Sequence, residues 1–251
     1  MKKLWLAITA CSIAWSSMAQ TADDVFAKHL EAIGGLDKIK SVQSVYMEGV
    51  SVAPNGMEIT SKTWRIQGKL FRQEINFGMG SMTTLVTDKD AWFSNPRNGG
   101  AFEAMPAEMR TRMSSELYAV TALTDYAAAG GKVELAGMEK VENTDCYVIK
   151  LSYGSGNPTT FYIDNKNWYV IRTSTKGRMG GGMMGGGNRG GAQAGQEVEM
   201  KIDYTDFTKT REGIVFPMTI KRPGMGGATM ATNIEKVEVN PKIDASLSKP
   251  E

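Results

Sequence analysis

The chain has 251 residues, of which 41% are hydrophobic and 22% charged, and its formal net charge is +2. This balance provides no basic surface of the kind that binds nucleic acid, so we expect no nucleic-acid partner. The length is sufficient for a hydrophobic core that is stable without covalent cross-links.

Residues 1–19 have the three parts of a secretory signal peptide. Two lysines precede an apolar stretch at 4–15, which is too short to span a bilayer, and small residues at 17–19 provide a cleavage site. We expect cleavage after Ala19, which leaves residues 20–251 as a single periplasmic domain. The alternative is lipidation, because residues 8–11 resemble a lipobox and would make Cys11 the membrane-anchored first residue.

Removal of residues 1–19 changes the composition of the chain. The number of basic residues then equals the 27 acidic residues, and Cys146 is the only cysteine left. No intramolecular disulfide can therefore form.

The first predicted element of the mature chain is a helix. Thr21 or Asp23 can cap its start, and Gly34-Gly35 ends it, because glycine accepts the left-handed conformation. Its apolar residues recur at helical spacing: Val25, Phe26, Leu30 and Ile33. Residues 36–40 predict a second, shorter helix.

From Val42 onward the hydrophobic period changes to two, which is typical of β-strands. Short turns rich in Gly, Pro, Asn and Asp separate the strands, so we expect antiparallel neighbours. So many strands exceed what a flat open sheet holds, and the sheet is expected to curve. Strands are predicted at 42–52, 57–67, 69–77, 81–87, 90–94, 132–140, 144–153, 158–164, 167–175, 196–207, 213–221 and 228–239.

A helix is predicted to interrupt the strands in the middle of the chain. Pro106 suits a first turn, and the helix is expected to continue to about Ala129. Its apolar residues repeat every four positions: Met105, Met109, Met113 and Leu117. The stripe has two interpretations, ordinary core packing or a lid over a cavity that methionine can fill adaptably.

Residues 177–196 are rich in Gly and Met, and we expect a flexible loop. Gly180, Gly182 and Gly185 match a dinucleotide-binding spacing, but a strand follows instead of the required helix, so we reject that reading. The loop methionines are weak candidates for Cu(I) binding or for an adaptable contact with lipid or protein, and a passive linker is the favoured interpretation: Met179, Met183 and Met184.

The sequence offers few groups for catalysis. His29 is the only histidine and lies on the apolar side of the first helix, where it predicts a packed side chain. Cys146 alternates with apolar strand residues and predicts a small buried side chain. The charged residues at 197–203 share the polar face of a strand and predict a solvated ladder: Glu197, Glu199, Lys201 and Asp203. We therefore expect no enzymatic activity and no cofactor.

Several stretches resemble the outer-membrane lipoprotein-sorting carriers: 22–49, 131–153, 159–173, 202–221 and 234–244. Together they cover nearly the whole mature chain. The resemblance implies an incompletely closed antiparallel β half-barrel, covered by the N-terminal helix and the inserted helix. It also implies an apolar space between sheet and helices that holds acyl chains.

The resemblance favours a periplasmic, monomeric binding protein for lipid acyl chains or lipoproteins. The alternative is the same fold acting as a sensor or interaction module for an envelope protein partner. Candidate lining residues come from the strands and the inserted helix, although alternation alone does not tell which face is concave: Trp64, Ile66, Phe71, Ile75, Phe77, Met109, Met113, Leu117, Met200, Tyr204, Phe216 and Met218.

Overall fold

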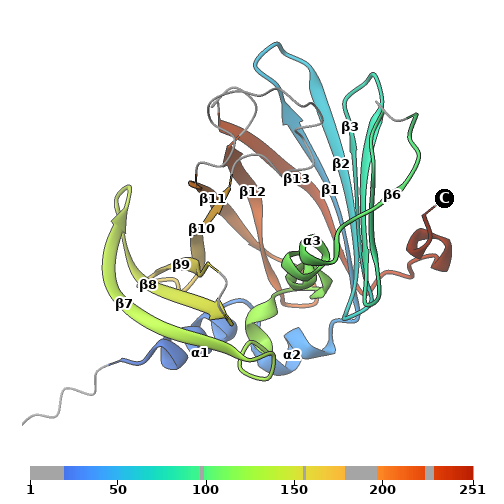
Figure 1. Cartoon of the computed structure of the whole chain (residues 1–251). Coiled ribbons are helices and arrows are strands. Elements are labelled where there is room, and N and C mark those ends of the chain that lie inside the picture. Colours follow the sequence, from blue (N-terminus) through green and yellow to red (C-terminus); the bar gives the residue numbers. More distant parts are fainter. Residues whose placement is uncertain (1–19, 97–98, 155–156, 179–196, 224–228, 251) are drawn as a thin grey trace, which may run out of the picture.

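A computed structural model describes residues 20–250 except 97–98, 155–156, 179–196 and 224–228. The predicted signal peptide, Cys11 and the loop methionines lie outside the described residues. Figure 1 shows one strongly curled sheet whose concave side holds the helices. The predicted fold class, a mainly β protein with a curved antiparallel sheet and few helices, is therefore confirmed.

All described strands join one sheet in the order β6-β5-β4-β3-β2-β1-β13-β12-β11-β10-β9-β8-β7, and every pair is antiparallel. The strands are β1 (Ser44–Val52), β2 (Glu58–Ile66), β3 (Leu70–Asn76), β4 (Ser81–Thr87), β5 (Ala91–Ser94), β6 (Glu103–Ala104), β7 (Gly131–Val141), β8 (Thr144–Tyr153), β9 (Thr159–Asp164), β10 (Val170–Arg178), β11 (Glu197–Lys209), β12 (Val215–Pro223) and β13 (Thr229–Val239). Every predicted strand is present within a few residues of its expected ends. The sequence pattern missed only β6, which has two residues.

Helix α1 (Ala22–Ala32) begins at a capping box, in which Thr21 Oγ1 accepts a hydrogen bond from the Asp24 amide at 3.1 Å and the Asp24 carboxylate accepts one from the Thr21 amide at 3.0 Å. The helix ends at Gly34, whose φ is +139°. A Cβ at this position would lie 2.9 Å from the Gly213 carbonyl oxygen. Glycine therefore allows the end of α1 to dock on the β11–β12 turn, where the Val215 amide donates to the Ile33 carbonyl at 2.9 Å.

The helices pack against the concave side through two apolar clusters. Helix α1 packs on the β7–β9 end of the sheet through a cluster of Val25, Phe26, Leu123, Ile149 and Ile163, with Ala22 and Leu151. Helix α2 (Leu36–Ser41) contributes to a second cluster, which includes Ile33, Ile39, Val45, Ala119 and Phe216. Figure 1 shows α1 below β7 and β8, and α2 next to it along the bottom of the sheet.

The inserted helix is much shorter than predicted. Helix α3 spans only Ala107–Arg112, followed by the 3-10 turns η2 (Ser114–Leu117) and η3 (Ala122–Thr124). Contacts with the β2–β3 turn replace the helical hydrogen bonds beyond Leu117. The Gly68 amide donates to the Leu117 carbonyl at 2.8 Å, and the Ala119 amide donates to the Gln67 side chain at 2.9 Å. The prediction of a helix continuing to about Ala129 is therefore wrong.

The C-terminal residues lie on the convex side of the sheet, beside β3 (Figure 1). The 3-10 turn η5 (Ala245–Ser248) is held there by Arg72, whose Nη1 donates to the Leu247 carbonyl at 3.3 Å. Leu70 and Leu85 are buried on this side. The C-terminus therefore covers the convex side of the β3–β4 region, and the inserted segment covers its concave side around Phe71 and Val86.

Candidate functional site

Strand register assigns each residue of the sheet to the concave or the convex face. Phe71 of β3 packs with Leu117 of the inserted segment, so its side chain lies on the concave face. Directly opposite residues share a face, and Phe71 lies opposite Arg65 of β2 and Val86 of β4. Two further steps along β3, Ile75 therefore also lies on the concave face.

Trp64 and Ile66 lie on the convex face. Trp64 is opposite Tyr46 and Arg72, and its ring centroid is 5.3 Å from that of Tyr46. Ile66 is opposite Leu70, which is buried on the same side. The prediction that Trp64 and Ile66 line one wall with Phe71 is wrong, because β2 turns its more apolar side outward.

The remaining predicted lining residues fall into different environments. Met218, Tyr204 and Met200 lie on the concave face, and the Met200 side chain is 53% exposed. Phe216 is buried in the cluster formed with α2. Phe77 follows the end of β3, at the turn. The inserted segment contributes Leu117 and Met113 to the cluster around Phe71, and Met109 is half-buried.

The middle of the concave face carries half-buried apolar side chains that belong to none of the buried clusters found among the described residues. Ile75 lies opposite Met82, and the Ile234 side chain lies beside Gly49 on the same face. We call this set the open apolar stretch: Ile75, Met82, Met218, Ile220, Met230 and Ile234. It includes two of the predicted lining residues, Ile75 and Met218.

Polar side chains are interspersed with the open apolar stretch and are hydrogen-bonded. Ser51, which is buried, and Thr232, which is half-buried, share a hydrogen bond of 2.8 Å between their hydroxyls. The Gln73 amide donates to Thr63 Oγ1 at 3.2 Å. The concave face is therefore amphipathic, with both apolar contacts and hydroxyl groups.

An ion pair attaches the inserted segment to the concave face. Arg65 Nη2 lies 2.6 Å from Glu116 Oε2, and Arg65 Nε donates to the Glu116 carbonyl at 3.3 Å. The two side chains are 21% and 40% exposed. The sequence pattern missed this pair, because Arg65 alternates with Trp64 and Ile66 and has the pattern of a solvent-facing residue.

His29 and Cys146 are both buried, as their sequence contexts predict. Burial lowers the pKa of His29 to about 4, although its Nδ1 lies 2.8 Å from the Trp168 carbonyl, a bond that opposes the shift. Since a carbonyl only accepts, the neutral ring carries its proton on Nδ1. Burial raises the pKa of the Cys146 thiol to about 11, which leaves little thiolate at neutral pH.

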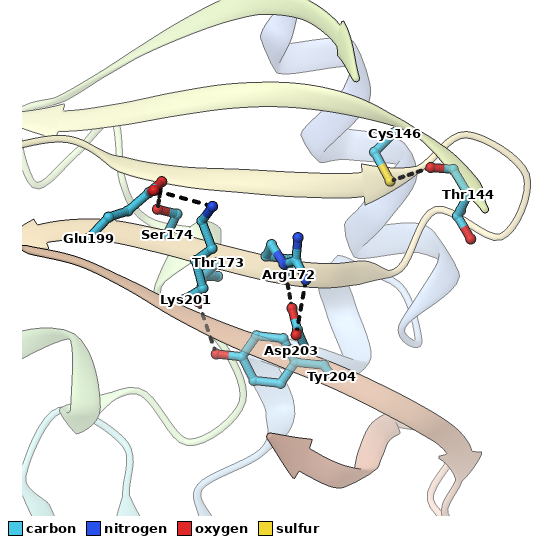
Figure 2. Close-up of polar contacts among 9 residues, drawn as sticks. All are labelled: Thr144, Cys146, Arg172, Thr173, Ser174, Glu199, Lys201, Asp203 and Tyr204. Atoms are coloured by element: carbon cyan, nitrogen blue, oxygen red, sulfur yellow. Dashed lines mark hydrogen bonds and ion pairs between the residues drawn. The ribbon is translucent and has the colours of Figure 1, made fainter. Parts of the chain in front are cut away.

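Glu199, Lys201 and Asp203 of the predicted ladder lie on the convex face, and Figure 2 shows their contacts. Glu199 accepts a hydrogen bond from Ser174 at 2.6 Å and pairs with Lys201 at 3.2 Å. Arg172 forms a two-point contact with Asp203. On the other face of the same strands, Tyr204 and Thr173 share a hydrogen bond of 3.2 Å.

Two hollows open elsewhere on the surface. One of about 450 Å³ lies along β7 and β8 and is lined mainly by polar residues, including Lys132, Glu134 and Lys150. The other, of about 150 Å³, lies between the start of α3 and β5. Neither hollow contains a residue that the sequence predicts to contact acyl chains. The concave face is therefore the better candidate for binding an apolar ligand.

Among the residues that the structure describes, no group of three or more His, Cys, Asp or Glu side chains is placed to hold a metal ion. None of the helices in this part of the chain is long and apolar enough to cross a membrane.

Comparison with solved structures identifies the fold. A LolA superfamily protein from Nitrosomonas europaea is 13% identical, with 91% of this chain and 98% of that chain covered and a TM-score of 0.57. A domain assigned to outer membrane lipoprotein sorting, from Vibrio parahaemolyticus, is 10% identical, covers 89% and 94%, and has a TM-score of 0.53. A DUF1329 family protein from Desulfovibrio piger is 14% identical, covers 92% and 98%, and has a TM-score of 0.57.

The sequence itself matches no protein-family profile and no curated protein. The structural matches nevertheless extend over nearly the whole chain. The protein therefore has a LolA-like fold, as the sequence resemblance implied.

Proposed function

We propose that the mature protein is a periplasmic carrier that binds the acyl chains of a lipid or lipoprotein on its concave face. The observation that supports this most directly is the open apolar stretch, whose side chains are half-buried and packed into no core cluster. Covering these side chains with an acyl chain would remove apolar surface from water, worth about 0.8 kcal/mol per buried methylene. No covalent step or cofactor is needed.

Methionine suits such a surface. Met82, Met218 and Met230 belong to the open apolar stretch, and Met113 lies on the inserted segment above the sheet. Unbranched thioether chains adapt to apolar ligands of variable shape. The short α3, none of whose residues is buried, is suited to move when a ligand enters or leaves.

Residues 1–19 would direct the protein to the periplasm. Lipidation at Cys11 remains the alternative, in which case the protein would be a membrane-tethered acceptor. Mass spectrometry of the intact mature protein distinguishes the two, because cleavage at Ala19 gives an unmodified chain that begins at Gln20.

Binding can be tested with a fluorescent acyl probe and a matched pair of variants. Ile75 and Ile66 are both half-buried and lie on adjacent strands, but on opposite faces. Ile75→Gln is expected to weaken probe binding about three- to tenfold, since each lost buried methylene costs about 0.8 kcal/mol. Ile66→Gln is expected to leave binding unchanged.

The proposal fails if the native mature protein neither co-purifies with lipid, as judged by mass spectrometry, nor changes the fluorescence of the probe. Equal weakening by Ile66→Gln and Ile75→Gln would also contradict it, because the effect would then follow stability instead of the face.

A second candidate function is an envelope sensor or protein-interaction module on the same fold. It is favoured by the two apolar clusters, in which the protein's own helices already fill part of the concave side. This alternative predicts that the acyl probe does not bind and that a photo-reactive group at position 218 cross-links to a protein partner. Loss of that cross-link on adding acyl probe would instead support the carrier.

A further inference from the structure

Arg222 of β12 lies on the concave face. Arg222 is opposite Met230 of β13. Ile220, two residues before Arg222 on β12, is opposite Thr232. Thr232 is hydrogen-bonded to Ser51 and lies beside Gly49 on the concave side. Arg222 is therefore on the same side of the sheet as the open apolar stretch, close to two of its members.

This guanidinium lacks a partner among the described residues. Its Nε–H is buried and donates to no acceptor there, and no carboxylate of the described chain lies within ion-pair distance. The internal segments outside the description contain no Asp or Glu in their sequences. A carboxylate from those segments therefore cannot neutralise Arg222.

Three other arginines of the sheet are differently arranged. Arg65 pairs with Glu116, Arg72 with Glu74, and Arg172 with Asp203. Their side chains are 21%, 11% and 21% exposed, so partial burial of arginine goes together with a carboxylate in each case. Arginine stays charged at all physiological pH values, and a partly buried charge without a counter-ion is costly. Arg222 is thus ready to accept an anion from outside the chain.

The surroundings of Arg222 supply further hydrogen-bonding groups. Tyr204 lies on the facing strand, opposite Ile220, and shares a hydrogen bond with Thr173. Burial raises the pKa of Tyr204, and the charges of Glu116, Arg222 and Arg65 all act on the same phenol. These groups are therefore close enough to interact electrostatically. Arg65 and Glu116 neutralise one another, so Arg222 leaves this part of the concave face positive.

We propose that Arg222 binds the anionic head group of an amphiphile whose chain lies along the open apolar stretch. The inference deepens the proposed carrier function and depends on it. A guanidinium binds a carboxylate or a phosphate through two parallel hydrogen bonds. Apolar side chains flank it on two strands, namely Ile220 beside it on β12 and Met230 opposite on β13, so a ligand with both an anion and an acyl chain fits better than a free anion.

The test compares parinaric acid with its methyl ester, which share one fluorescent chain and differ in the negative charge. The native mature protein is expected to bind the acid at least about tenfold more tightly than the ester, a difference of about 1.4 kcal/mol. Arg222→Gln is expected to bind both equally, and Arg222→Lys to keep part of the preference. Arg211→Gln is the control, because Arg211 lies in the β11–β12 turn with its side chain 96% exposed, and it should keep the full preference.

The outcomes separate the two proposals. If acid and ester bind the native protein equally well, the head-group site is refuted while the carrier function stands. If neither binds, the carrier function falls and the head-group site with it. If inorganic phosphate binds the native protein about as tightly as parinaric acid does, and displaces it, then Arg222 binds a free anion. The proposal of an amphiphile is then refuted. Circular dichroism and thermal unfolding of Arg222→Gln check that the variant is folded, and retained ester binding by that variant supports the site.

Discussion

The two ends of the concave face differ in how they are covered. Over β8 and β9, α1 inserts Phe26 against Ile149 and Ile163, and all three are at most 1% exposed. Over β3 and β4, the inserted segment buries Phe71 and Val86 beneath Leu117. Its short helix α3 has no buried side chain, and the open apolar stretch beyond it, on β3, β4, β12 and β13, stays half-buried. The first end is a complete core, and the second has apolar groups left for a ligand. Stability and the proposed binding are therefore expected to reside in different parts of the same sheet.

The sharpest test of this difference truncates one apolar side chain at each end. Phe26 packs edge-on against Tyr126 and Phe161, with ring centroids 5.4 and 5.7 Å away. Phe26→Ala is expected to lower the free energy of unfolding by about 3–5 kcal/mol, whereas Met218→Ala in the open apolar stretch should cost about 1 kcal/mol or less. Urea denaturation monitored by tryptophan fluorescence measures both. Similar losses for the two variants would mean that the ends do not differ.

The covered end also predicts a pH dependence of stability. The pKa of His29 is about 4 in the folded protein and 6.5 as its ordinary value, so between these values only the unfolded chain gains the proton. The contribution of neutral His29 to the free energy of unfolding is therefore fully present above about pH 6.5. It falls by about 3 kcal/mol as the pH decreases toward 4, since each pH unit is worth about 1.4 kcal/mol.

His29→Gln supplies the comparison for this pH dependence. It keeps a donor for the Trp168 carbonyl but cannot titrate. Urea midpoints of the native protein and His29→Gln, measured from pH 7 to pH 4, should draw together as the pH falls. A constant difference between them across this range would show that His29 takes up its proton equally in both states.

Hydrophobic alternation in the sequence predicts the strands well, but it predicts less well which side chains lie on the concave face. In β11, Val198, Ile202 and Tyr204 alternate with charged residues, and the apolar side is the concave one. In β2 the same rule selects Trp64 and Ile66, which face outward against Tyr46 and Leu70. The difference arises because the C-terminal residues and neighbouring strands cover the convex side there. A period of two identifies two faces but does not say which one the rest of the chain will cover.

The contacts of the inserted segment and of Arg222 could not be derived from the sequence either. Helical spacing from Met105 to Leu117 predicts a long helix, but hydrogen bonds from Gly68 and to Gln67 end it. These contacts join residues about fifty positions apart, and no local pattern encodes them. Arg222 becomes notable only when the register places it on the concave face without a carboxylate beside it.

The smallest expected effect concerns the attachment of the inserted segment at the open end. Glu116→Gln removes the charge that pairs with Arg65, and because both side chains are partly exposed the loss of global stability should be about 1 kcal/mol or less. Local opening should change more, with amide hydrogen exchange of residues 107–117 becoming several-fold faster. Glu108→Gln is the matched control, since Glu108 pairs with Arg112 within α3 and both are largely exposed.

High salt should raise the amide exchange rates of the native protein toward those of Glu116→Gln, because it screens the Arg65–Glu116 ion pair. It should leave the exchange rates of the variant unchanged. Unaltered exchange in Glu116→Gln would show that the hydrogen bonds with the Gln67 side chain and the Gly68 amide suffice to hold the segment. Faster exchange limited to residues 107–117, with the β8 and β9 core as protected as before, would show that the cover of the open end moves independently of the filled end. A carrier needs that independence, because a ligand can then enter beside Ile75 and Met218 without disturbing the core around Phe26.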